Sequence, residues 1–339
     1  MPEKNILITG GLGFIGSNFI PHFLESNPHY HIFNLDAVTY AADKKNLEEV
    51  ESHSNYHFIQ GNICDEKLVE SLFAEHKFKN IIHFAAESHV DNSINSPGAF
   101  MQTNIIGTFN LLNAAFKLWH ESPFKTKEEF QTARFLHVST DEVYGSLGKT
   151  GLFSEDTPYA PNSPYSASKA SSDFIVRSYF HTYGLNTVTT NCSNNYGPKQ
   201  HDEKLIPTII RNALSEKSIP IYGEGTNIRD WLYVKDHCKG VELALKTGRA
   251  GETYNIGGNN ERTNNQICHK ICELLDDLKP RQAGSYKDLI TYVKDRPGHD
   301  FRYAINAGKI KENLNWKPDE NFESGIIKTL NWYLRKYSK

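Results

Sequence analysis

The sequence lacks the features of secreted, membrane-bound and nucleic-acid-binding proteins. Its 339 residues carry a formal net charge of −3 and only five cysteines, with no Cys-x-x-Cys pair. The small charge gives no sign of a nucleic-acid surface, and the scattered cysteines do not suggest a disulfide framework. No apolar run is long enough to cross a bilayer, and no signal peptide precedes the first predicted strand. The cysteine pattern predicts a reducing cytoplasm. The histidines show no metal-ligand spacing, so we also predict that the protein has no metal site.

What the chain does contain is a glycine-rich turn between a predicted strand and a predicted helix. Residues 4–9 predict a buried parallel strand, and Gly10, Gly13 and Gly16 follow it directly. Such glycines let the backbone turn tightly and approach a pyrophosphate, whose charge meets the helix N-terminus. Asp36 ends the next predicted strand, where an acid binds the ribose hydroxyls of a dinucleotide. A carboxylate there repels a 2′-phosphate, so the pattern favours NAD over NADP.

Predicted strands and helices alternate through the first half of the chain, which indicates an α/β fold with a doubly wound parallel sheet, the Rossmann fold. The further predicted elements are strands at 30–35, 56–60, 80–84, 134–138 and 186–192, and helices at 65–76, 97–119 and 163–183. We predict an NAD-binding domain over 1–190, to which 234–256 returns, and a smaller mixed α/β domain over 191–339. Residues 121–131 are predicted to form a solvated loop, and residues 194–198 a turn.

A second pattern places a phenol and an ammonium on one face of a predicted helix. Tyr165 and Lys169 are four residues apart, and therefore lie one helical turn apart. A free tyrosine has a pKa near ~10, and roughly 4 kcal/mol of stabilisation would make its phenolate common at neutral pH. We expect Lys169 and a positively charged nicotinamide to supply that stabilisation, so that Tyr165 acts as a base.

Two carboxyls follow another predicted strand, in the run Ser-Thr-Asp-Glu-Val-Tyr-Gly at 139–145. Neighbouring carboxyls push each other's pKa values apart, so one of Asp141 and Glu142 can stay protonated while the other ionises. Spacing alone does not say which is the acid and which the base. The pair predicts a second proton-transfer step at the same edge of the sheet as the glycine-rich turn.

These motifs together resemble the extended short-chain dehydrogenases/reductases, and more narrowly the dTDP-glucose 4,6-dehydratases. The similar strings run through nearly the whole chain, at 86–91, 163–169, 191–198, 203–207, 228–233 and 295–300. The run Thr140-Asp141-Glu142 is what separates the dehydratases from related epimerases. The resemblance implies tightly bound NAD, dTDP-glucose as the substrate, and a place in deoxysugar biosynthesis for rhamnose-containing cell-surface polysaccharide such as lipopolysaccharide. The predicted helices at 97–119 and 163–183 carry more apolar positions than one sheet face needs, which predicts a homodimer. The resemblance also implies a homodimer.

The resemblance also implies roles for individual residues. The implied catalytic residues are Tyr165, Lys169, Asp141, Glu142 and Thr140. The implied cofactor-binding residues are Gly10, Gly13, Phe14, Ile15, Gly16, Asp36, Thr39, Asn62, Ile63, Ala85, Ala86, Ser88, Thr103, Tyr165, Lys169 and Asn195. The implied substrate-binding residues are Ser88, Thr140, Asn194, Lys204, Leu205, Pro220, Tyr222, Arg229, Asn264, Asp295, Arg296 and His299. Trp231 and Tyr233 are predicted to be core residues instead.

The implied reaction is an internal redox cycle that yields dTDP-4-keto-6-deoxy-glucose. Tyr165 takes the proton of the C4 hydroxyl as C4 is oxidised. Thr140 hydrogen-bonds the C4 oxygen, and Lys169 holds the phenolate and the nicotinamide ribose. The C5 proton, now alpha to a carbonyl, passes to Glu142, and Asp141 protonates the departing C6 hydroxyl. C6 is then reduced, so the cofactor ends unchanged.

Other functions stay open at this stage. The chain could be a dehydratase or 4-epimerase of another nucleotide sugar, carrying UDP, CDP or GDP, or a non-catalytic scaffold that binds NAD or a nucleotide sugar. An epimerase has no use for Asp141 and Glu142, and a silent scaffold could have lost Tyr165 or Lys169. The chain departs from the family at Asn62, where Asp is frequent, at Asn92, where Arg is frequent, and over the loop 198–202.

Overall fold

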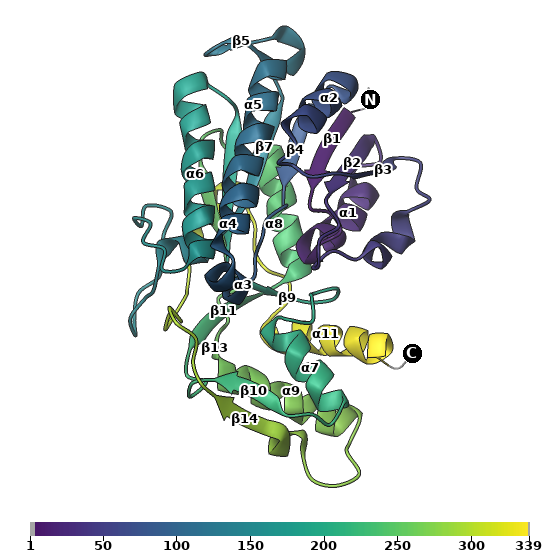
Figure 1. Ribbon diagram of the computed structural model, residues 1–339, viewed down its shortest axis with the longest axis vertical. Coiled ribbons are helices and arrows are strands. Elements are labelled where there is room, and N and C mark those ends of the chain that lie inside the picture. Colours follow the sequence, from purple (N-terminus) through teal and green to yellow (C-terminus); the bar gives the residue numbers. More distant parts are fainter. Residues whose placement is uncertain (1–3, 338–339) are drawn as a thin grey trace.

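A seven-stranded parallel sheet forms the larger part of the computed structural model, which describes residues 4–337 (Figure 1). From one edge to the other the sheet contains β12 (Thr253–Ile256), β8 (Thr187–Cys192), β7 (Arg134–Thr140), β4 (Asn80–His83), β1 (Lys4–Thr9), β2 (Tyr30–Asp36) and β3 (Tyr56–Gln60). The chain runs outward from β1 to β3, and then crosses back to β4 and runs outward in the other direction. The order therefore reverses between β1 and β4, and ligands of such sheets bind beyond the carboxyl ends at that point.

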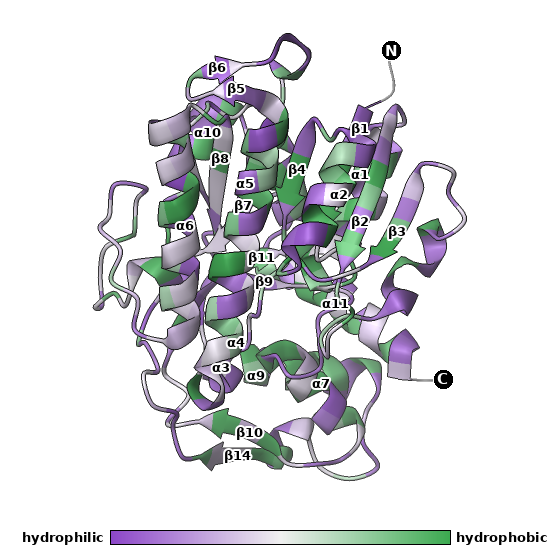
Figure 2. Ribbon diagram, turned by 45° about the horizontal axis from the view of Figure 1, so that its top comes forward, coloured by the Kyte–Doolittle hydropathy of each residue, from purple (hydrophilic) through white to green (hydrophobic). Residues whose placement is uncertain are grey.

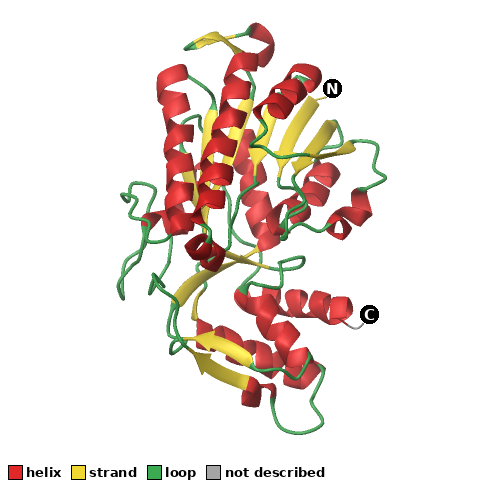
Figure 3. Cartoon of the chain, in the orientation of Figure 1, coloured by secondary structure: helices red, strands yellow, loops and turns green. Residues whose placement is uncertain are grey.

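Helices cover both faces of this sheet, as the doubly wound prediction requires (Figure 3). One face carries α2 (Glu66–His76), α4 (Pro97–Phe100), α5 (Thr108–Trp119) and α6 (Pro164–Tyr183). The opposite face carries α1 (Phe14–Ser26), α8 (Val234–Thr247) and α10 (Gly308–Leu314). Strand β4 is largely hydrophobic (Figure 2), and Ile6, Leu7 and Ile8 of β1 are completely buried. Burial on both faces explains why these strands show continuous apolar runs.

A smaller part of the chain lies beyond the carboxyl ends of the large sheet (Figure 1). It contains a sheet of β13 (Glu261–Thr263), β11 (Ile228–Tyr233) and β9 (Asn194–Tyr196), and a parallel pair of β10 (Ile219–Tyr222) and β14 (Ile290–Val293). Its helices are α7 (Leu205–Leu214), α9 (Asn264–Leu278) and α11 (Phe322–Tyr337). These elements enclose a separate apolar cluster, in which Trp231 and Tyr233 are buried as predicted.

The remaining elements are short connections. They are the 3₁₀ helices at Lys44–Val50, Glu128–Phe130, Asp141–Tyr144 and Tyr286–Leu289, the helix α3 (Val90–Asn95), and the hairpin of β5 (His120–Ser122) and β6 (Lys125–Thr126). No helix among residues 4–337 is long and apolar enough to cross a membrane.

Three predicted elements are wrong in detail. The predicted loop at 121–131 is instead the hairpin β5–β6 with a 3₁₀ turn, in which Lys127 Nζ donates to the last carbonyls of α5 and Phe130 is buried. The predicted helix at 97–119 is interrupted by a wider, π-helical turn at Met101–Gly107. The predicted turn at 194–198 contains the short strand β9, because β11 pairs with it through Trp231 to Tyr233.

The chain does return to the large sheet after residue 190. Helix α8 packs on β7 and β8, as expected for the return of 234–256, and β12 adds an edge strand that the sequence did not indicate. Helix α10 also returns and packs on α8 and β12, which the sequence did not indicate. The division into two domains at residue 190 stays a prediction.

Candidate active site

The glycine-rich turn forms a cradle that only glycine fits at two positions. A Cβ on Gly16 would lie 2.5 Å from Gly10 O, and one on Gly10 would lie 2.6 Å from Ala85 N. Gly10 also has a φ of +72°, a conformation that side chains disfavour. Gly13 caps helix α1 without a side-chain bond, so the first amides of the helix face the space in front of them. The cradle therefore fits a diphosphate.

Asp36 lies at the carboxyl end of β2, beside this cradle. Its Oδ2 accepts from Leu12 N at 2.9 Å and its Oδ1 from Val38 N at 2.8 Å. Burial raises the pKa of Asp36, while these two amide bonds lower it. Each oxygen keeps a lone pair for a ribose hydroxyl. The carboxylate is thus fixed where the sequence placed it.

One cavity of about 320 Å³ collects the predicted cofactor-binding residues along the carboxyl ends of the strands. Every predicted member lines it: Gly10, Gly13, Phe14, Ile15, Gly16, Asp36, Thr39, Asn62, Ile63, Ala85, Ala86, Ser88, Thr103, Tyr165, Lys169 and Asn195. The residues present therefore fit a dinucleotide such as NAD. Among residues 4–337, no group of three or more His, Cys, Asp or Glu side chains is placed to hold a metal ion.

Tyr165 and Lys169 enter the same cavity from the first turns of α6. Ser163 and Ser166 form a capping box at the start of this helix, and Pro164 occupies its first position, so its register is well defined. Lys169 Nζ donates to Val138 O at 2.9 Å. Both side chains are buried.

The pKa of Tyr165 differs from the sequence-based expectation. Burial raises it well above its usual value, and the nearby Glu142 raises it further, while a hydrogen bond with Thr140 lowers it. Lys169 points to Val138 O and does not by itself lower the pKa of the phenol. The expected phenolate therefore depends on the positive nicotinamide and on a Lys169 ammonium directed at the phenol.

Thr140, Asp141 and Glu142 lie at the end of β7, where the strand passes into a 3₁₀ turn. Thr140 caps this turn by accepting from Glu142 N at 3.3 Å, and its hydroxyl donates to Asp141 Oδ1 at 3.4 Å. Burial raises the pKa of Asp141 well above its usual range, and Glu142 raises it further. All three residues line the cavity together with Tyr165.

Four of the predicted substrate-binding residues also line this cavity, namely Ser88, Thr140, Asn194 and Lys204. Lys204 Nζ donates to Ser88 O at 2.9 Å, which ties the chain before α7 to the loop after β4. The other eight do not line it: Leu205, Pro220, Tyr222, Arg229, Asn264, Asp295, Arg296 and His299. The structure therefore divides the predicted substrate set into two groups.

Within the second group, two residues contact Asp91, and His299 lies near one of them. Arg296 Nη1 is 3.2 Å from Asp91 Oδ1, and the Tyr222 hydroxyl donates to Asp91 Oδ2 at 3.3 Å. His299 pairs with Asp295 at 2.6 Å, and its ring is 6.4 Å from that of Tyr222.

Several hydrogen-bond donors of the Arg229 guanidinium are already bonded to backbone carbonyls of the protein. Its guanidinium donates to the carbonyls of Ile228, Asp300 and Phe301 at 2.7, 2.9 and 3.3 Å, and packs 4.2 Å from the ring centre of Tyr303. These bonds use several of its five donors. Arg229 still lowers the pKa of Glu142, so its charge acts on the cavity.

Sequence reasoning missed Glu203, which lines the cavity between three loops. Its carboxylate lies 3.5 Å from the Tyr40 hydroxyl, 3.8 Å from His89 Nδ1 and 3.7 Å from His201 Nδ1. It also missed Asp173, a buried acid one turn after Lys169. The i, i+4 spacing of Lys169 and Asp173 on one helix was the signal that could have found the second.

The family model and two curated relatives that match this chain are nucleotide-sugar 4,6-dehydratases. The family model described as GDP-mannose 4,6 dehydratase matches residues 7–329. A dTDP-glucose 4,6-dehydratase of Xanthomonas campestris is 53% identical over 97% of this chain and 92% of its own length. One of Neisseria meningitidis is 52% identical over 98% of this chain and 93% of its own.

The chain belongs to the dTDP-glucose 4,6-dehydratase family.

Solved structures of this family share the whole fold. The dTDP-glucose 4,6-dehydratase of Bacillus anthracis, in complex with NAD, is 46% identical with a TM-score of 0.85, covering 99% of this chain and 98% of its own. That of Streptomyces venezuelae, with NAD bound, is 41% identical with a TM-score of 0.88, covering 98% of each chain. A UDP-glucose 4-epimerase of Thermotoga maritima also matches, at 27% identity and a TM-score of 0.84, covering 98% of this chain and 99% of its own. The fold alone therefore does not separate dehydratases from epimerases, and the site residues must do so.

Proposed function

We infer that this protein dehydrates dTDP-glucose to dTDP-4-keto-6-deoxy-glucose, with NAD as a resident cofactor. The observation that carries the inference is the carboxyl pair Asp141 and Glu142, which lines one cavity with Tyr165 and Lys169. Oxidation at C4 requires only the tyrosine, the lysine and the cofactor. Removal of water across C5 and C6 requires a base and an acid in addition, and the pair supplies both.

The first step is assigned to Tyr165, Lys169 and Thr140. Tyr165 takes the proton of the C4 hydroxyl, and the single proton of the Thr140 hydroxyl, which in the free protein points to Asp141 Oδ1, turns to the C4 oxygen. The Lys169 ammonium favours the phenolate and holds a ribose hydroxyl. Bound NAD accepts a hydride from C4 and later returns it to C6. The buried setting excludes water from this exchange.

Elimination is assigned to Glu142 as base and Asp141 as acid. Burial raises the pKa of Glu142, but the cations Arg229, Arg296 and Lys204 lower it, so this carboxyl is the one that ionises more readily. The more strongly raised pKa of Asp141 keeps its proton available for the leaving C6 hydroxyl. These different environments support Asp141 as the acid and Glu142 as the base.

The nucleotide end of the substrate is assigned to the second group of residues. Leu205 begins α7, and Arg229 contributes positive charge beside Glu142. Asn194 and Lys204 of the first group line the cavity itself. Arg296, with Tyr222, Asp295 and His299, presents polar groups suited to a diphosphate and its base. Pro220 and Asn264 complete the proposed set.

The test is turnover with matched nucleotide sugars. Purified protein is incubated separately with dTDP-, UDP-, CDP- and GDP-glucose, and the products are followed as alkali-sensitive keto sugars and by mass. Loss of one water from dTDP-glucose in preference to the others is expected. A 4-epimer of unchanged mass would identify an epimerase. If no nucleotide sugar reacted, the result would favour the non-catalytic scaffold.

We further propose that the protein is a cytoplasmic homodimer. Apolar side chains remain exposed on α5 and α6 and on the elements just before α5, namely Phe109, Phe174, Ile106 and Ile94. Such a stripe is buried when two helix pairs pack together. All five cysteines are free thiols, which suits a reducing compartment.

A further inference from the structure

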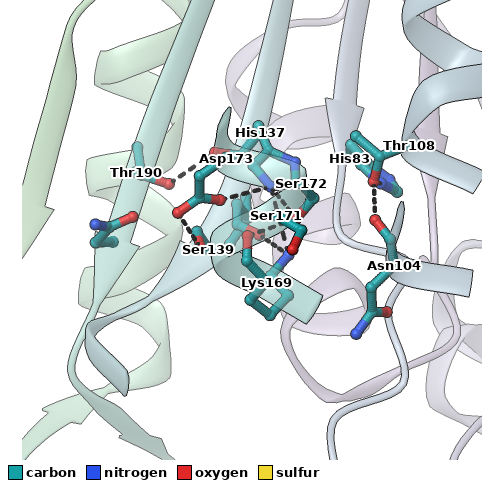
Figure 4. A network of polar contacts seen from close by, with 12 residues as sticks. His83, Asn104, Thr108, His137, Ser139, Lys169, Ser171, Ser172, Asp173 and Thr190 are labelled. Carbon is teal, nitrogen blue, oxygen red and sulfur yellow. Dashed lines mark hydrogen bonds and ion pairs between the residues drawn. The ribbon is translucent and has the colours of Figure 1, made fainter. Parts of the chain in front are cut away.

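Asp173 faces the interior of the sheet–helix layer one turn beyond Lys169 on α6 (Figure 4). Its carboxylate is buried and receives three hydrogen bonds from other elements. His137 Nε2 lies 3.1 Å from Oδ1, while the Ser139 hydroxyl and the Tyr159 hydroxyl donate to Oδ2 at 2.8 and 3.0 Å. A carboxylate with three donors in place is fixed in position and stabilised as an anion.

The imidazole of His137 lies between this carboxylate and Lys169. Its Nε2 is 3.1 Å from Asp173 Oδ1 and 3.5 Å from Lys169 Nζ. Burial lowers the pKa of His137 well below its usual value, so the ring is neutral. Its Nδ1 is buried without a hydrogen-bond partner in the described structure, so we assign its proton to Nε2, facing the carboxylate. His137 therefore donates its Nε2 proton to Asp173, lies next to Lys169 without accepting from it, and carries no charge of its own.

Asp173 supplies the negative charge beside the buried ammonium. Burial lowers the pKa of Lys169, and Asp173 is the largest influence that raises it. Burial raises the pKa of Asp173 to about 6, against the influence of Lys169, Ser139 and Tyr159. The other titratable groups facing this pair, from β4, β8, the 3₁₀ turn and α6 itself, are His83, Cys192, Tyr144 and Tyr165. Among these described groups, Asp173 is the one with a negative charge at neutral pH.

We propose that Asp173 is a positioning residue for the first proton transfer, which keeps Lys169 charged so that its ammonium can turn to the Tyr165 phenolate. This inference rests on the proposed function, since it concerns the same tyrosine–lysine pair. A buried ammonium without a partner is strongly disfavoured and releases its proton instead. A neutral amine no longer favours the phenolate, so the C4 proton is not removed.

The primary test is Asp173→Asn in the NAD-loaded enzyme. Asparagine keeps the shape and can exchange hydrogen bonds with Ser139 and His137, but it removes the charge. We expect kcat to fall roughly tenfold or more with little change in KM, and the alkaline limb of kcat to move down by roughly 1–3 pH units. The ¹³Cε resonance of Lys169, assigned by its loss in Lys169→Met, should titrate at a correspondingly lower pH.

Two further variants separate charge from shape. Asp173→Glu retains the charge and should keep the alkaline limb close to that of the wild type. Tyr159→Phe retains the carboxylate but removes one donor to it, which raises the pKa of Asp173. Its plateau kcat should stay near the wild-type value, while the acid limb moves to higher pH.

The proposal is overturned if Asp173→Asn leaves both the alkaline limb and the Lys169 titration unchanged. If that variant does not fold, Tyr159→Phe decides, and an unchanged acid limb overturns the proposal. The Lys169 titration needs no turnover, so it still tests Asp173 if dTDP-glucose proves not to be the substrate.

Discussion

Asp141 and Glu142 are adjacent in the chain, yet their carboxyls lie in different electrostatic surroundings. Asp141 is 2% exposed, and its Oδ2 has no hydrogen-bond partner among the described residues. Three cations, Arg229, Arg296 and Lys204, act on Glu142, whereas Arg229 alone is prominent for Asp141. Asp141 therefore holds its proton more firmly than its neighbour, and its free oxygen is available to a substrate.

Glu142→Gln should separate the two halves of the reaction. Oxidation at C4 needs Tyr165, Lys169 and NAD, so the variant should bind dTDP-glucose and accumulate reduced cofactor, visible by absorbance. Proton removal at C5 needs a carboxylate, so product formation should fall by ~10²–10⁴-fold. Tyr165→Phe is the matched control and should give no reduced cofactor. If Glu142→Gln exchanged the C5 proton with deuterated solvent at the wild-type rate, Glu142 would not be the base.

Asp141→Asn should stabilise the protein at neutral pH. The folded-state pKa of Asp141 is raised, so its contribution to folding is fully favourable only below the unfolded pKa and is lost as the pH rises through the folded value. A pKa that is one pH unit higher in the folded than in the unfolded chain costs ~1.4 kcal/mol of stability above both values, and an amide avoids this cost. The Tm of the variant should exceed that of the wild type at pH 7, and the difference should shrink towards pH 4. An equal difference at both pH values would contradict a buried, protonated carboxyl.

Gly16→Ala should abolish cofactor retention. The added Cβ would lie 2.5 Å from Gly10 O and 2.7 Å from Gly11 Cα, so the cradle would have to open. Wild-type protein should release nicotinamide nucleotide when it is denatured after purification, and Gly16→Ala should release little or none. Gly98→Ala is the control, because a Cβ there meets nothing within 4 Å. Equal nucleotide content in both variants would place the dinucleotide elsewhere.

A charge on the α5–α6 surface should dissociate the proposed dimer. Phe109 and Phe174 are 38% and 57% exposed in the single chain, and an aspartate at either position would be buried unpaired in a dimer. Light scattering at micromolar concentration should give a dimer mass for the wild type and a monomer mass for Phe109→Asp or Phe174→Asp. Ile327→Asp, at an exposed position on α11, should leave the dimer mass unchanged. A wild-type monomer would reject the idea outright.

The sequence predicted the strands of the sheet except β12, and it grouped the residues that line the cavity, because both depend on local pattern. Strand β1 runs over Lys4–Thr9 as predicted, and every expected cofactor residue lines the cavity. A glycine spacing or a run of apolar residues is fixed by neighbours along the chain. These signals survive folding because a buried parallel strand must be apolar on both faces.

Features set by distant contacts were harder to predict. Strand β9 exists because β11, more than thirty residues later, pairs with it. The direction of Lys169 depends on Val138 O and on Asp173, and its effect on the pKa of Tyr165 could not be derived from helical spacing. Arg229 matched a binding motif, yet backbone carbonyls occupy much of its guanidinium. The spacing of residues along the chain predicts which side chains lie close together, but it does not predict which hydrogen-bond partner each of them takes.

The late return of α8 and β12 to the large sheet has a consequence for how the chain folds during synthesis. Val234, Cys238 and Val241 of α8 belong to the same apolar cluster as Ile6 and Phe19, near the start of the chain. Until α8 and β12 have left the ribosome, that face of the sheet is covered by α1 without α8, and β8 keeps an open edge. An exposed apolar face and an unpaired edge are what chaperones bind and what drives aggregation. Slower synthesis or added chaperone should therefore raise the yield of active protein.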